Sequence, residues 1–179
     1  RIDSMHWQSV WARFFAGTGK FDEALALLEA VIKDRPGSAD ALILKGDLLW
    51  KAKADKAGAR QTYLKSVESN PRDINGHIGL IRLALSDNDL VSYGKQLEAI
   101  KSAFPKHPET AVRELEFAIL SGSTGKMRER ADALLKIAPD NARVLQLAGT
   151  GDLESGALSS AESRFQAAMK HAPRMASAR

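Results

Sequence analysis

The chain has 179 residues and a formal net charge of +4, and 44% of its residues are hydrophobic but only 6% are aromatic. This length suits one domain or a repeat array, and the hydrophobic content excludes wholesale disorder. No apolar run reaches the roughly 18 to 20 residues that span a bilayer. The sequence contains no cysteine, which excludes disulfides and thiolate metal sites.

The positive charge is spread along the chain. Residues 1–90 contain 13 Lys and Arg against 12 Asp and Glu, and residues 91–179 contain 13 against 10. A nucleic-acid interface is normally a clustered basic face, whereas acids and bases alternate here as on a solvated surface. The distribution disfavours nucleic acid as a ligand.

Five of the six prolines recur with a regular period. Pro36, Pro71, Pro105, Pro139 and Pro173 are 35, 34, 34 and 34 residues apart. Each follows a stretch in which apolar residues recur at steps of three and four, the helical period. Because proline lacks an amide hydrogen and restricts the residue before it, each one ends a helix and lets the chain turn.

Each period contains a second break, which divides it into two short antiparallel helices. In chain order, the breaks are small or polar segments at residues 17–20, 52–55, 86–89, 122–125 and 154–156. We predict five helix–turn–helix repeats, at approximately residues 5–38, 39–73, 74–107, 108–141 and 142–175. The predicted fold is an all-α, right-handed α-solenoid in which residues 1–179 form a single array.

Residues at fixed offsets resemble the tetratricopeptide repeat family, whose period is 34 residues. The small residue that this family has in the first helix occurs as Ala12, Gly46 and Gly149. Its small–aromatic–small trio in the second helix occurs as Ala161, Phe165 and Ala168, and as Ala59, Tyr63 and Ser66. The third and fourth repeats depart from the pattern, with Ile81, Leu115, Tyr93 and Met127 at positions for small residues. We expect local packing to differ in these two repeats.

Both ends of the sequence predict a longer array. The chain starts Arg1-Ile2-Asp3, without an initiator Met or a leader. Six residues follow Pro173, too few for the polar helix that caps a solenoid. We therefore expect a segment of a longer protein in which Phe165 and Met169 are partly uncovered.

The resemblance implies that the first helix of each repeat lines a concave groove. The groove positions are His6, Ser9 and Arg13; Asp40, Ile43, Asp47 and Trp50; Asn75, Ile78, Arg82 and Leu85; Glu109, Val112, Glu116 and Ile119; and Arg143, Gln146, Thr150 and Leu153. An apolar stripe flanked by charge suits a peptide or protein partner, and Trp50 is the expected anchor because aromatic residues dominate interfaces. The alternative, that neighbouring repeats cover the stripe, stays open. A ligand held by its terminal carboxylate is disfavoured by Asp40 and Asp47.

No catalytic, cofactor or metal site is predicted. Segments 17–20 and 122–126 have Gly and Lys but lack the spacing and the preceding strand of a phosphate loop. The four histidines have no paired metal-ligand spacing, and 87–89 lacks the other ligands of a calcium loop. No nucleophile, base and orienting residue form a set, so we expect a non-enzymatic protein.

Several stretches resemble the large repeat lipoprotein of bacterial PEP-CTERM/exosortase systems, among them 42–49, 77–84, 105–110 and 144–149 followed by Ala161-Glu162. The resemblance implies a periplasmic or outer-membrane lipoprotein linked to exopolysaccharide export and protein sorting; otherwise a cytoplasmic location is expected. A protein-interaction scaffold is the leading hypothesis. Two alternatives stay open: a solenoid that binds carbohydrate or nucleic acid, and a structural spacer that self-associates through its uncapped ends.

Overall fold

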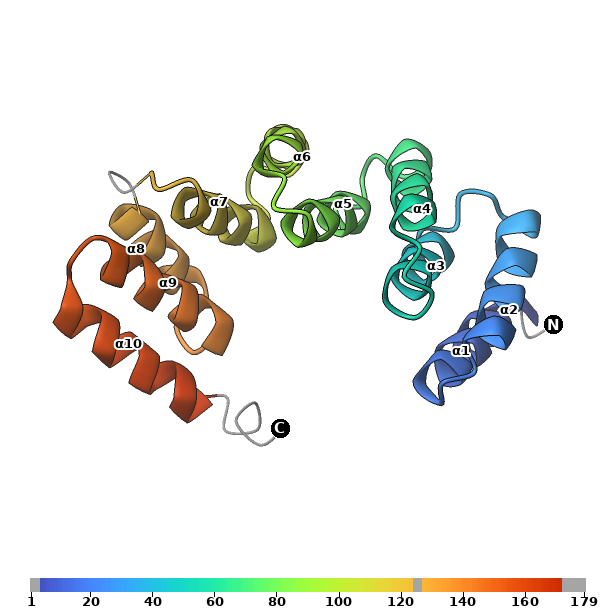
Figure 1. The fold of residues 1–179 in the computed structure, drawn as a ribbon, viewed down its shortest axis with the longest axis horizontal. Coiled ribbons are helices and arrows are strands. Elements are labelled where there is room, and N and C mark those ends of the chain that lie inside the picture. The colour runs from blue at the N-terminus through green and yellow to red at the C-terminus, as the bar shows by residue number, and fades with distance from the viewer. Residues whose placement is uncertain (1–3, 124–126, 172–179) are drawn as a thin grey trace. The chain divides into compact units, whose positions relative to one another are not determined.

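A computed structural model describes residues 4–123 and 127–171, with side chains from Trp7 onward. Within these residues all the regular structure is helical (Figure 1). The helices are α1 (Ser4–Gly17), α2 (Phe21–Asp34), α3 (Ala39–Lys51), α4 (Lys56–Ser69), α5 (Asn75–Ser86), α6 (Leu90–Ala103), α7 (Pro108–Leu120), α8 (Met127–Ile137), α9 (Ala142–Glu154) and α10 (Leu158–His171). The predicted all-α fold of helix–turn–helix pairs is confirmed.

The turn inside each helix pair has a left-handed backbone residue. These residues are Gly19, Ala54, Asn88, Gly122 and Gly156, with φ between 52° and 80°. Such a residue ends a helix and reverses the chain, which is why glycine is favoured there. Their spacing repeats the period of the prolines, so both breaks of every repeat are built into the local sequence.

The chain divides into two compact units, residues 1–103 and 104–179. The first unit contains α1–α6 and the second contains α7–α10. In the first unit, α1 packs against α3 and α3 against α5, so the first helices of its repeats are neighbours. In the second unit, α7 packs against α9 in the same way. A single array over residues 1–179, with the repeat boundaries given above, stays a prediction.

The first unit has a core built from helical spacing. On α2 the buried residues are Ala24, Leu28 and Val31, four and three residues apart on one face. They pack with Ala12 of α1 and Leu48 of α3. Fully burying one such aliphatic side chain contributes about 1.5–3 kcal/mol, so short helices that are marginal alone become stable together.

Large residues fill the core of the two repeats that depart from the family pattern. Ile81 and Tyr93 in the first unit, and Leu115 and Met127 in the second, are all 0% exposed. Leu115 and Met127 belong to one apolar cluster with Ala131 and Ala148. These departures therefore change how the interior is filled and leave the helix pairs intact.

Candidate partner-binding site

Tyr63 of α4 contacts two other helices of the first unit, α3 and α5. Its side chain is 0% exposed, and its ring lies against Gly46 of α3 and Gly79 of α5. A Cβ atom would lie 2.5 Å from the ring at Gly46 and 2.6 Å from it at Gly79. A side chain at either position would meet the closed ring, so both positions favour glycine.

The hydroxyl end of Tyr63 reaches a charged pair. Its Oη donates a hydrogen bond to Oδ1 of Asp47, at 2.6 Å, and the same oxygen lies 3.2 Å from a guanidinium nitrogen of Arg82. Burial raises the pKa of the Tyr63 hydroxyl, and the hydrogen bond to Asp47 raises it further. The hydroxyl therefore stays protonated and keeps donating to Asp47.

Arg82 also lies over the indole of Trp50. Its guanidinium carbon is 5.3 Å from the ring centroid, within the range of a cation–π interaction. The side chains of Asp47 and Arg82 are 27% and 30% exposed, and Trp50 is half-buried. We call Asp47, Trp50 and Arg82 the Trp50 cluster. All three were predicted from the sequence as groove residues, and in the structure Arg82 contacts both of the others.

The other candidates in the first unit differ in exposure. Arg13, Asp40 and Asn75 are exposed, whereas Ser9, Ile43, Ile78 and Leu85 are half-buried. Ile43 packs beside the apolar cluster that contains Tyr63. The side chain of His6 lies outside the described residues. Tyr63 itself was predicted from the sequence as a packing residue and not as part of the site. The signal in the sequence was its spacing of 16 residues from Asp47, which lies on the other helix of the same repeat.

A second charged cluster occurs in the second unit, around Arg113 of α7. This side chain is 3% exposed and pairs with Glu109 and Glu116 of the same helix, the latter at 2.6 Å. Glu116 also lies 3.4 Å from Arg143 of α9. The sequence prediction named Glu109, Glu116 and Arg143 but missed Arg113, although its spacing of four and three residues from two glutamates is typical of helical ion pairs.

Val112 does not offer the exposed apolar surface that was expected. It is 7% exposed and packs in the core beside Leu115, so the expectation of an apolar groove position there is wrong. Gln146 and Leu153 are exposed, and Ile119 and Thr150 are half-buried.

The three histidines whose side chains the structure describes have structural contacts. His77 Nδ1 lies 2.8 Å from Gln96, His107 Nδ1 accepts the backbone N–H of Glu109 at the start of α7, and His171 lies 3.5 Å from Asp140. In the part of the chain that the structure describes, no group of three or more His, Asp or Glu side chains could hold a metal ion. The described helices are also too short or too polar to cross a membrane.

The helices occur in pairs, and in two of these pairs a glycine of the first helix lies against an aromatic ring of the second, Gly46 with Tyr63 and Gly149 with Phe165. This arrangement is that of a helical repeat protein. Residues 10–74 match the model of the tetratricopeptide repeat family. This match and the fold together support a tetratricopeptide repeat protein, a class whose members generally mediate protein–protein interactions and are typically not catalytic.

Similar proteins cover different shares of the chain. The human protein O-mannosyl-transferase TMTC3 is 30% identical over 104 residues, which are 58% of this chain and 11% of TMTC3. The chain thus spans about a tenth of that relative's length.

Solved structures give the same fold at low identity. A crystal structure of MamA is 15% identical, with a TM-score of 0.68 over 99% of this chain and 97% of MamA. A thermophilic tetratricopeptide repeat protein of Thermus thermophilus is 17% identical, with a TM-score of 0.73 over 95% and 92%. The Pseudomonas aeruginosa protein pilF is 12% identical, with a TM-score of 0.76 over 94% and 77%. Likeness at these identities shows the fold alone.

Proposed function

We propose that the chain is a non-catalytic scaffold that binds a peptide or protein partner on the first helices of its repeats. In the first unit this face is formed by α1, α3 and α5, which are neighbours. The observation that carries the proposal is the Trp50 cluster, in which the half-buried indole of Trp50 lies under Arg82 and Arg82 also pairs with Asp47.

The Trp50 cluster has the properties of an interface anchor. Trp and Arg are enriched among residues that contribute most to binding energy, especially where surrounding contacts exclude water. The hydrogen bond from buried Tyr63 holds Asp47 in place, so little side-chain entropy is lost when a partner binds. Arg13 and Asp40 add exposed charges of both signs on the same unit. A suitable ligand is a peptide segment with an apolar residue flanked by mixed charges.

Selection of a random peptide library displayed on phage would test this face directly. The enriched peptide would be titrated into the wild-type chain and into Trp50→Ala, Trp50→Phe and Arg82→Glu by fluorescence anisotropy. Because an anchor residue contributes at least about 2 kcal/mol, we expect Trp50→Ala to raise Kd by about 30-fold. Arg82→Glu should weaken binding as well, and Trp50→Phe should weaken it less.

The matched control is Lys33→Glu, which reverses an exposed charge on α2. It should leave Kd unchanged, and far-UV circular dichroism should show full helicity in every variant. If Trp50→Ala and Arg82→Glu both keep the wild-type Kd for peptides selected on the wild-type chain, the Trp50 cluster is not the binding site.

We further propose that the partner belongs to bacterial envelope machinery for exopolysaccharide export and protein sorting, with the parent chain as a lipid-anchored protein. The sequence resemblance to the PEP-CTERM/exosortase lipoprotein family supports this. The complete reading frame provides the test. A lipobox cysteine beside exosortase or glycan-export genes is the expected finding, and a reading frame without a leader among unrelated genes would contradict the proposal.

A further inference from the structure

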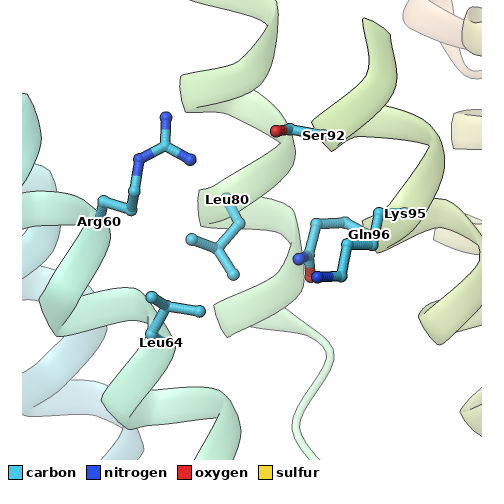
Figure 2. A pocket seen from close by; sticks show the side chains of 6 residues that line it. All are labelled: Arg60, Leu64, Leu80, Ser92, Lys95 and Gln96. Atoms are coloured by element: carbon cyan, nitrogen blue, oxygen red, sulfur yellow. The ribbon is translucent and has the colours of Figure 1, made fainter. Parts of the chain in front are cut away.

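A pocket on the first unit lies away from the Trp50 cluster. It has a volume of about 170 Å³ and is lined by Arg60, Leu64, Leu80, Ser92, Lys95 and Gln96. Figure 2 shows α4 residues on one side, α6 residues on the other, and Leu80 of α5 between them. Leu80 and Arg82 are two residues apart, which places them about 200° apart around α5. The pocket and the Trp50 cluster therefore occupy opposite sides of this helix.

The floor of the pocket is apolar. Leu80 is 4% exposed and belongs to the core, whereas Leu64 is 42% exposed. The exposed part of Leu64 gives a bound aliphatic group a surface that would otherwise contact water. The lining residues thus favour a ligand with an apolar portion.

The side chain of Gln96 lines the pocket and is hydrogen-bonded to α5. Nδ1 of the buried His77 lies 2.8 Å from Oε1 of Gln96. Because a carboxamide oxygen only accepts, Nδ1 donates this hydrogen bond. The NH₂ group of Gln96 is then left as the donor of this side chain.

Cations outnumber acids around the pocket. Lys56 and Arg60 pair with Asp87, and Arg60 also acts on Asp89. Lys95 lines the pocket and has no ion pair among the described residues. Asp87 is bound more closely by Lys56 than by Arg60, whose guanidinium is 3.5 Å away. Arg60 therefore keeps donors for a ligand, and the region has an excess of positive charge.

We propose that this pocket binds an aliphatic carboxylate, a small group with an anionic head and a branched apolar stem. Lys95, Arg60 and the Gln96 amide would hold the carboxylate by charge-assisted hydrogen bonds, while the stem lies on Leu64 and Leu80. A short acid is of a size that this pocket of about 170 Å³ can hold.

The test is a titration of the ¹⁵N-labelled chain followed by NMR. The probes are 4-methylvalerate, N-acetyl-leucine and the uncharged 4-methylvaleramide. We expect saturable shifts of backbone amides near Leu64, Lys95 and Gln96 with both acids and much smaller shifts with the amide. Loss of one charge-assisted hydrogen bond in Lys95→Met should raise Kd about tenfold.

Lys33→Met on α2 is the matched control and should leave Kd unchanged, and Arg60→Met should repeat the effect of Lys95→Met from the other side of the pocket. Tighter binding of N-acetyl-leucine would assign the pocket to the chain end of a peptide, and tighter binding of the free acid would assign it to a small metabolite. No saturable shift with either acid, equal shifts with the amide, or an unchanged Kd in both Met variants would overturn the proposal.

Discussion

Replacing Gly79 with alanine tests whether the Tyr63 ring fixes the approach of α4 to α5. The new Cβ would lie 2.6 Å from Cδ1 of the ring. The ring cannot retreat freely, because Gly46 of α3 lies against it as well. Overpacking of a closed core costs about 1–3 kcal/mol, and the higher helix propensity of alanine offsets about 1 kcal/mol of this. We expect Gly79→Ala to lower the free energy of unfolding by about 1 kcal/mol.

Gly151→Ala on α9 is the matched control. Its Cβ would lie 3.7 Å from Met127 and 3.8 Å from Leu115, at ordinary contact distance. The gain in helix propensity then has no opposing clash, and stability should rise by up to about 1 kcal/mol. Urea denaturation followed by far-UV circular dichroism, which reports helices of both units, would give the two midpoints.

A double-mutant cycle separates the clash from other effects of the substitution. In a Tyr63→Leu background the ring is absent, so Gly79→Ala should be neutral or stabilising. An equal loss of stability with and without the ring would refute the reasoning, as would a Gly79→Ala variant more stable than the wild type.

Three further predictions concern local features. Ala54→Gly should stabilise the chain by about 1 kcal/mol, because φ at Ala54 is 55° and a left-handed residue with a side chain costs about 1–2 kcal/mol. A lower urea midpoint for Ala54→Gly would contradict this. Gly19→Ala, the reverse change at an equivalent turn, should lower the urea midpoint. Asn141→Ala should cost about 1 kcal/mol, since Oδ1 of Asn141 accepts the backbone N–H groups of Arg143 and Val144; Asn141→Ser should retain most of the stability in the same denaturation assay. The raised pKa of Tyr63 predicts that stability falls as pH rises above about 10, where an unfolded tyrosine ionises but the folded one does not. Tyr63→Phe should make the melting temperature at alkaline pH less dependent on pH. An unchanged dependence would exclude Tyr63 as the cause of the alkaline loss of stability.

The helix pairs could be predicted from the sequence because each repeat signals its own breaks. Prolines with a period of 34 or 35 residues marked one break, and short segments that include Gly19 and Asn88 marked the other. Both signals are local, since they depend on backbone conformations that few residues adopt. The structure has left-handed residues at the same period, so little tertiary information was needed for the fold.

Exposure at single positions could not be predicted in this way. Val112 and Ile43 occupy the same position in the first helix of their repeats, yet Val112 is buried in a core and Ile43 is half-buried. The difference depends on which side chains neighbouring helices supply. In the fourth repeat, Leu115 and Met127 replace small residues and belong to the apolar cluster that covers Val112. The spacing of residues along the sequence does not reveal such packing.

Tyr63 contributes both to the fold and to the candidate site, because its ring and its hydroxyl make different contacts. The ring closes on Gly46 and Gly79, a contact that belongs to the fold. The hydroxyl holds Asp47, which in turn lies against Arg82 and positions it over Trp50. A change of the ring therefore alters stability and site geometry together, whereas loss of the hydroxyl alone leaves the ring packing in place and releases Asp47. A difference between Tyr63→Leu and Tyr63→Phe in peptide affinity, measured at equal helicity, would thus separate the contribution of the fold from that of the preorganised charge.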